Sequence, residues 1–206
     1  MDGKILLIGG GLGLLALYLF RKKNEDENNA KNADKETEDL TNQETQQALM
    51  LKSLLNPKKV VVIGWTTNNL KSRADYPKVA EILNTLLSVT KWAAVQNSFL
   101  KLCDKEYTLL NALQNALPTD IYKKAVEIAA AKKIQTVKDV TAILKDSTAP
   151  TGMATIQFQK NTLIGALQKY SGGDAYFING YKSDGNILKD LIEMSGYVAK
   201  NSVKEI

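Results

Sequence analysis

The longest apolar run of the chain lies near its N-terminus, where sixteen consecutive residues, 5–20, carry no charge. At about 1.5 Å per residue, a helix over this run spans roughly 24 Å, against a ~30 Å hydrocarbon core. Lys4, Arg21, Lys22 and Lys23 border the run and are expected at the membrane interface. The pattern predicts a single transmembrane anchor over residues 1–22. The side chains expected in the bilayer are Ile5, Leu6, Leu7, Ile8, Leu12, Leu14, Leu15, Leu17, Tyr18, Leu19 and Phe20.

The end of this run argues against a cleaved signal. It lacks the small-x-small pattern of a signal-peptidase site. A lipoprotein signal would need a cysteine at its cleavage point, and the only cysteine of the chain is Cys103. The positive-inside rule then places the C-terminal part on the cytoplasmic or an equivalent side. Residues 23–43 contain a single large apolar residue, Leu40, which predicts a flexible charged linker.

The remaining residues, 44–206, have the composition of one globular domain. After Asp75, apolar residues at Val79, Ile82, Leu83 and Leu86 follow a helical spacing. Similar apolar spacings and capping residues predict further helices, the last of them capped by Gly196. Their ranges are 44–55, 92–103, 107–117, 119–129, 137–144, 155–170, 175–181 and 185–195. The β-branched run 60–65 predicts at most one short strand pair. The expected fold class is therefore all-α.

Composition excludes several kinds of chemistry. The chain has no histidine, which removes Ser-His-Asp, Cys-His and His-ligated metal sites. Cys103 lies on an apolar helical stripe and is interpreted as a core residue. No Walker loop and no GxGxxG motif occurs. We therefore expect no catalytic residue, no cofactor and no metal, and a protein that is not an enzyme.

The excess of positive charge in the globular domain is compatible with binding to polyanions. Residues 44–206 carry 21 Lys and Arg against 14 Asp and Glu, and Arg73 is the single arginine among them. Base and phosphate recognition relies on bidentate arginine. A spread positive charge instead favours weak, non-specific attraction to nucleic acid or anionic lipid.

One segment faintly resembles lytic transglycosylases. Tyr170 and the glycines Gly172 and Gly173 are similar to their YNGG-type segment, and Gly152-Met153 to their Gly-x-Met-Gln motif. The catalytic acid would then be Glu127. That residue belongs to a Lys-rich helical pattern without the usual following serine, and the spacing is too short. A Gly-rich turn is the preferred interpretation, with peptidoglycan cleavage as a remote alternative.

A second resemblance covers about a third of the chain. The segment 95–128, with an aromatic at Phe99 and a capped helix after Pro118, looks like the second half of an annexin-type repeat. A fainter copy covers 176–196. The resemblance implies degenerate helical repeats over 76–131 and 155–206. It implies no calcium site, because only Gly64-Trp65-Thr66 stands where the calcium loop would be.

The predicted order of a short apolar anchor, a charged linker and a helical domain also resembles the layout of one group of phage proteins. These are the membrane-anchored accessory proteins of membrane-containing tailless bacteriophages of Bacteroidota hosts. The resemblance implies a non-enzymatic scaffold that links the internal membrane of a virion, or a bacterial inner membrane, to a protein partner. That partner would be a capsid lattice or a second copy of the chain. The alternatives remain a tethered binder of nucleic acid or anionic lipid, and a peptidoglycan-cleaving enzyme.

Overall fold

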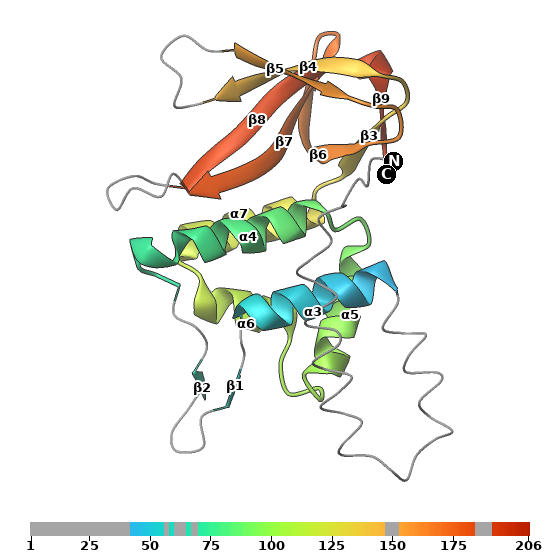
Figure 1. The fold of residues 1–206 in the computed structure, drawn as a ribbon. Coiled ribbons are helices and arrows are strands. Elements are labelled where there is room, and N and C mark those ends of the chain that lie inside the picture. Colours follow the sequence, from blue (N-terminus) through green and yellow to red (C-terminus); the bar gives the residue numbers. More distant parts are fainter. Residues whose placement is uncertain (1–41, 56–57, 60–64, 67–69, 147–152, 184–190) are drawn as a thin grey trace, which may run out of the picture.

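The computed structural model describes residues 42–55, 58–59, 65–66, 70–146, 153–183 and 191–206. Helices precede a large sheet along the chain (Figure 1). The helices are α3 (Gln43–Leu55), α4 (Tyr76–Leu87), α5 (Trp92–Leu102), α6 (Leu109–Ala116) and α7 (Thr119–Ala130), with short 3-10 turns at Arg73–Asp75 and Lys200–Ser202. The strands of the large sheet are β3 (Lys133–Thr136), β4 (Val140–Asp146), β5 (Met153–Phe158), β6 (Leu163–Ser171), β7 (Asp174–Ser183), β8 (Leu191–Ala199) and β9 (Val203–Glu205).

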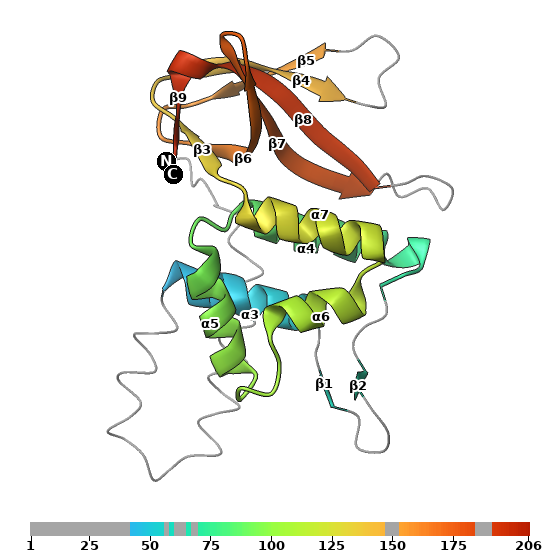
Figure 2. The same cartoon turned by 180° about the vertical axis from the view of Figure 1, so that it is seen from behind.

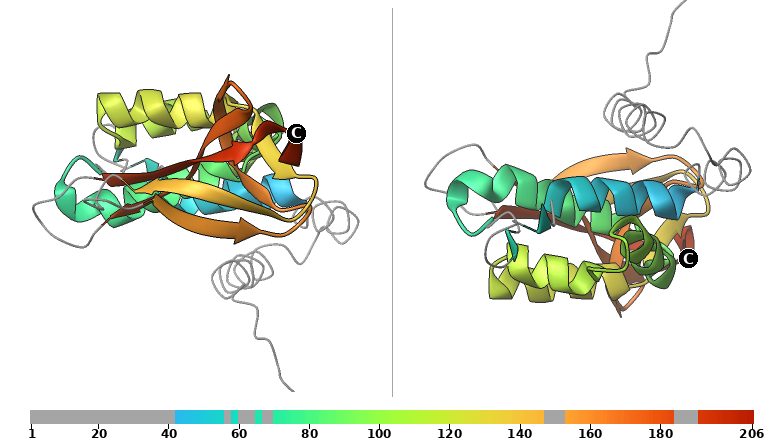
Figure 3. Two further views of the ribbon diagram at one scale, coloured as in Figure 1. Left: turned by 90° about the horizontal axis from the view of Figure 1, so that it is seen from above. Right: turned by 90° about the horizontal axis from the view of Figure 1, so that it is seen from below.

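The seven strands form one antiparallel sheet in the order β5-β4-β8-β7-β6-β3-β9. A separate pair, β1 (Lys58–Lys59) and β2 (Trp65–Thr66), is also antiparallel. Figures 1 and 2 show the sheet on one side of the molecule, α4 and α7 directly beneath it, and α3, α5 and α6 farther away. The views from above and below in Figure 3 show how the helices extend under the sheet.

Two apolar clusters hold these layers together. The larger one joins the helices to one face of the sheet: Ile82, Phe99 and Leu113 pack in one cluster with Ala166 and Ile178. The smaller one lies on the other face of the sheet, around Phe177, Ala142, Ile134 and Val198. Phe158 and Phe177 meet there edge to face, with ring centroids 6.4 Å apart. The sheet is thus buried on both faces, but over different parts of its area.

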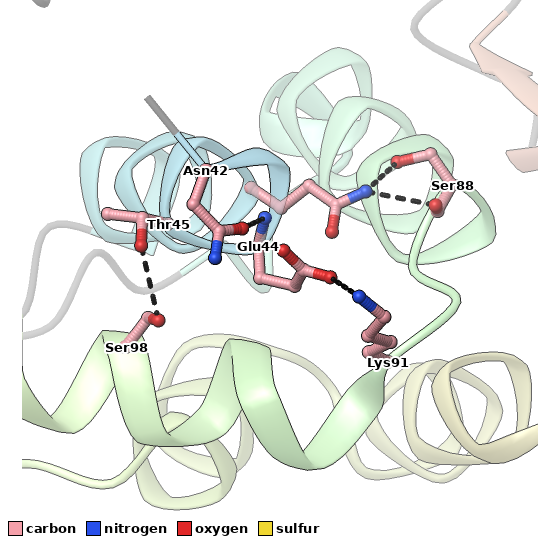
Figure 4. A network of polar contacts seen from close by, with 7 residues as sticks. Asn42, Glu44, Thr45, Ser88, Lys91 and Ser98 are labelled. Carbon is pink, nitrogen blue, oxygen red and sulfur yellow. Dashed lines mark hydrogen bonds and ion pairs between the residues drawn. The ribbon is translucent and has the colours of Figure 1, made fainter. Parts of the chain in front are cut away.

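A polar network fixes the start of α3 (Figure 4). The Asn42 Oδ1 accepts a hydrogen bond from the Glu44 backbone N–H at 2.9 Å, and Glu44 pairs with the Lys91 Nζ at 2.9 Å. The hydrogen bond from Lys91 holds the pKa of Glu44 below its usual value. Gln47 donates from Nε2 to the Ser88 carbonyl at 2.9 Å. These contacts tie α3 to the turn between α4 and α5.

The all-α prediction is wrong. The segments 137–144, 155–170, 175–181 and 185–195, predicted as helices, contribute instead to β4, β5, β6, β7 and β8, where they are described. Side chains there alternate between faces with a period of two: Ala175 and Phe177 point into the smaller cluster, whereas Tyr176 is on the opposite face. Residues four apart share a face in a strand as they do in a helix, and the bulges of β6 and β7 shift the alternation by one residue, so these segments also contain helical spacings.

The predicted annexin-like repeats are corrected by the same finding. Residues 76–131 form helices α4 to α7, but the described part of 155–206 is almost entirely strand, so the second segment cannot repeat the first. Gly196, predicted as a helix cap, lies inside β8. A Cβ at this position would be 2.5 Å from the carbonyl oxygen of Ile143 on the neighbouring strand, so the glycine permits close approach of two strands.

The prediction of a single-pass membrane protein, located in a virion membrane or a bacterial inner membrane, is also corrected. In the part of the chain that the structure describes, no helix has both the length and the apolar character that crossing a bilayer requires. The longest helix among the described residues, α3, has 13 residues and spans roughly 20 Å. The segment 5–20, with Lys4, Arg21, Lys22 and Lys23, and all of the predicted linker 23–43 except residues 42 and 43 lie outside the described residues; α3 already begins at Gln43.

One side chain joins α4 to the sheet through two backbone bonds. Asn84 donates from Nδ2 to the Tyr181 carbonyl at 2.9 Å, and its Oδ1 accepts from the Tyr181 N–H at 2.7 Å. β6 pairs with β7 only as far as Ile178, so within the described chain the amide of Asn84 stands where a strand partner of Tyr181 would be.

Replacing Asn84 with Ala is therefore expected to lower the free energy of unfolding by about 1–3 kcal/mol. The reason is that two backbone groups of a buried residue lose their partner, with the penalty reduced because Asn84 is itself exposed to water. Urea denaturation measures the loss. Asn111→Ala, at an exposed position of α6, is the matched control and should change stability by less than about 0.5 kcal/mol. Equal effects of the two substitutions would contradict the role assigned to Asn84.

Candidate functional site

A row of side chains crosses five strands of the sheet on its helix-facing side. Register pairs place Lys169 of β6 opposite Tyr176 of β7, and Tyr176 opposite Tyr197 of β8. Tyr197 is in turn opposite Ile143 of β4, and Ile143 opposite Thr155 of the edge strand β5. Directly paired residues of antiparallel strands project to the same face. These five residues, named here the exposed row, therefore lie side by side on one surface.

The helices stop short of this row. Ile178, two residues farther along β7 than Tyr176 and so on the same face, is 4% exposed and packs in the helix-facing cluster. In the exposed row, by contrast, Tyr197 is 38% and Ile143 is 41% exposed. Tyr176 is half-buried, and Lys169 and Thr155 are exposed. The boundary of the helix layer thus runs between neighbouring rows of one sheet face.

The two tyrosines form the centre of the row. The rings of Tyr176 and Tyr197 have centroids 5.0 Å apart and are tilted by 39°. Such aromatic pairs hold each other in place, and each phenol leaves a polar tip toward water. Polar exposed residues border the centre, namely Thr141, Lys145, Gln157 and Lys169. An apolar centre with a polar rim is the usual anatomy of an interaction surface.

The row ends at an open edge of the sheet. In the described chain β5 pairs with β4 alone, over six consecutive residues without a bulge. Its sequence, MATIQF, contains no charge and no proline. The other edge, β9, is only three residues long and carries Lys204 and Glu205. Short length and charge are devices that protect an edge from pairing with another chain, and β5 has neither.

Several ionisable groups lie where α7 meets the sheet, on the part of the sheet face that the helices cover. The Tyr181 hydroxyl donates to Glu193 Oε2 at 3.1 Å, and Lys124 of α7 forms an ion pair with the same carboxylate. The Lys124 Nζ also lies 5.2 Å from the Tyr181 ring centroid. Burial, together with the negative Glu193, raises the pKa of Tyr181 well above its usual value. The phenol therefore stays protonated near neutral pH, and its contacts with Glu193 and Lys124 join α7 to the sheet.

Lys133 is a buried cation at the same junction. It is 1% exposed, and its Nζ donates to the carbonyls of Ile128 at 2.5 Å and Ala131 at 3.0 Å, at the C-terminal end of α7. Burial lowers the pKa of Lys133 to about 8. A helix C-terminus favours a positive charge, which offsets part of the burial penalty. Almost fully buried and bonded to two carbonyls, this amine is a structural cap for α7.

A groove of about 390 Å³ lies between α3 and α4. The lining residues are Met50, Pro77, Ala80, Glu81, Asn84, Thr85 and Ser88. The amide of Asn84 is bonded to Tyr181, and the hydroxyls of Thr85 and Ser88 donate to backbone carbonyls of α4, so these polar groups already have partners within the protein. The exposed carboxylate of Glu81 does not by itself form the convergent set of polar groups that characterises a small-molecule site.

The residues that the sequence analysis considered for catalysis do not form one site among the described residues. Cys103 is buried at the end of α5, where burial raises the pKa of its thiol, so its interpretation as a core residue is confirmed. Glu127 is exposed on α7, whereas Tyr170 lies on β6 and donates a hydrogen bond to Glu205 Oε1 at 3.1 Å. Gly152 and all predicted membrane residues lie outside the described chain.

Sequence reasoning missed the exposed row. Its only signal is the alternation in 174–178 and 195–199, where Tyr176 and Tyr197 stand between residues that face the smaller cluster.

Among the described residues, no group of three or more His, Cys, Asp or Glu is placed to hold a metal ion. Comparisons with protein-family models, with curated proteins and with solved structures found no match. The fold and site define a two-part α/β protein with a partly uncovered antiparallel sheet.

Proposed function

We propose that this protein is a non-enzymatic structural protein that docks another protein on the uncovered part of its sheet face. The observation that supports the proposal is the exposed row, with Tyr176, Tyr197 and Ile143 at its centre and polar side chains around it. Tyrosine provides a large contact area at low entropic cost and is enriched where binding energy concentrates. The absence of histidine from the sequence supports the non-enzymatic part. A capsid lattice, implied by the resemblance of the layout, stays a prediction.

The docking face is tested by Ile143→Ser/Tyr197→Ser in the full-length chain. Partners that crosslink to the tagged wild-type protein in its native host are identified, purified and titrated against both chains. The double variant should bind at least about tenfold more weakly, because it loses the central contacts of the face. Met50→Ser/Val137→Ser removes apolar side chains of 40% and 37% exposure elsewhere and should bind as the wild type does. Equal affinity of the face variant and the wild type would refute the proposal.

A second candidate function is binding of single-stranded nucleic acid, favoured by two lysines beside the tyrosines. Lys169 is opposite Tyr176, and Lys145 is on the same face of β4 as Ile143. Bases stack on aromatic side chains while lysines contact phosphates. Fluorescence titration with a single-stranded oligonucleotide decides between the two functions. Binding that weakens with salt and is lost in Lys145→Gln/Lys169→Gln would favour nucleic acid, whereas protein docking should survive this substitution.

A further inference from the structure

We propose that the edge strand β5 pairs antiparallel with β5 of a second copy of this chain, which joins the two sheets into one across a two-fold axis. This inference goes beyond the proposed function, because it concerns the backbone groups of an edge and not the side chains of the exposed row. It starts from the difference between the two edges of the sheet. β9 is short and charged, whereas β5 is six residues long, uncharged and regular.

The backbone of β5 is able to take another strand. Its pairing with β4 runs from Met153 opposite Lys145 to Phe158 opposite Val140 without a register shift. Alternate residues of such a strand direct their N–H and C=O groups away from the sheet. Pairing two copies would form about four to six hydrogen bonds between these groups. An unprotected edge of this kind is the usual site of strand addition.

The side chains of β5 fit a second copy of the same strand. Ile156 and Phe158 pack against the smaller cluster but remain half-buried, so this cluster is open at the edge. A two-fold axis through Ile156 places each Phe158 opposite Ala154 of the other copy, and the two Ile156 side chains opposite each other. A large side chain thus meets a small one, and both copies extend the apolar cluster across the axis.

Charge points to the same partner. On the exposed face the same axis places Thr155 opposite Gln157 of the other copy, a neutral pair. Within residues 153–158 no charge meets a like charge, although the whole chain has a net charge of +5. Two copies of a basic protein can therefore pair at β5 without bringing like charges together. Because the axis is perpendicular to the sheet, the exposed rows of both copies would face the same side.

The test is the mass of the full-length protein across a concentration series, measured by sedimentation equilibrium. The wild type should shift toward twice 22.7 kDa as concentration rises. Thr155→Lys/Gln157→Lys should stay monomeric, because each new lysine faces a lysine of the other copy. Thr155→Lys/Gln157→Glu should dimerise, because each lysine then faces a glutamate. Asn111→Lys/Gln114→Lys adds the same charge to exposed positions of α6 and should behave as the wild type does.

Each result supports or overturns the pairing. A wild type that is monomeric throughout, a dimeric Lys/Lys variant, or a Lys/Glu variant that is monomeric while folded overturns it. Far-UV circular dichroism and urea denaturation establish that each variant is folded. All variants retain residues 1–41, so any association through that segment is common to them. Ile143→Ser/Tyr197→Ser should still dimerise, which makes failure of the docking face distinguishable from failure of the edge.

Discussion

Gly165→Ala is expected to prevent formation of a stable sheet, with a loss of at least about 4 kcal/mol in the free energy of unfolding. Gly165 lies in β6 with φ +145°, in a region that side-chain-bearing residues rarely adopt. A Cβ there would be 1.9 Å from the carbonyl oxygen of Ile178 and 3.1 Å from the Cα of Asn179. Both atoms belong to the backbone of β7, so relief would require two central strands to separate.

The neighbourhood of Gly165 explains why the sheet cannot yield locally. It pairs with Ile134 of β3 next to a register shift, and Asn179 donates from Nδ2 to the carbonyl of the preceding residue, Ile164, at 2.7 Å. Ile134 and Ile164 are fully buried in the smaller cluster. Movement of β6 away from β7 would therefore open that cluster as well as break the ladder between them.

Two glycines of the β6–β7 turn provide graded controls for this prediction. Gly172 has φ +60° with nothing within 4 Å of its Cβ position, so Gly172→Ala should cost about 1–2 kcal/mol through backbone strain alone. Gly173 also has open space and no positive φ, so Gly173→Ala should be nearly neutral. Soluble yield and urea denaturation of the three variants check the order. A Gly165→Ala protein as stable as Gly172→Ala would contradict the close contact with Ile178.

Lys133 is expected to make the stability of the protein rise with pH between about 8 and 10.5. Its pKa is about 8 in the folded protein and 10.5 as the ordinary value. Below pH 8 both states bind the proton, and the cost of burying the ammonium is fully present. Between the two values the unfolded chain binds more protons than the folded one, so raising the pH favours folding. Over this window the gain is about 3 kcal/mol.

The measurement compares the wild type with Lys133→Met by urea denaturation at pH 7.5 and 10.5. Other groups also titrate in this range, including Tyr181, whose raised pKa acts in the opposite direction above pH 10. They are common to both proteins, so the difference between the two pH dependences isolates Lys133. The Lys133→Met variant should lack the rise in the free energy of unfolding that Lys133 causes between these two pH values. Parallel pH dependences would mean that the ammonium is not buried at the end of α7.

The helical half of the protein is predictable because its contacts are largely local in character. The spacing of Val79, Ile82, Leu83 and Leu86 defines a face, and α4 buries that face. The cap at Thr108, whose side chain accepts from the Asn111 N–H, and Pro118 before α7 likewise lie next to the elements that they start. Helical hydrogen bonds close within four residues, so the information needed is contained in a short window.

The sheet was not predictable in the same way. Strands β6 and β7 alternate only over short stretches interrupted by bulges at 167–169 and 178–180, which weakens the period-two signal. The pairing of β4 with β8, and of β3 with β9, joins segments far apart in the chain. A single sequence does not indicate which strand lies beside which, because many pairings bury the same residues.

By itself the sequence indicated which side chains are available for chemistry, and it located the helices between residues 43 and 130. It has no histidine, and Cys103 belongs to the core. The tertiary structure alone decided that Tyr176, Tyr197 and Ile143 share one surface, and that β5 is an edge strand among the strands that the structure describes. The physical reason is that helix formation depends on neighbours along the chain, whereas a sheet surface arises only when distant strands settle into one register.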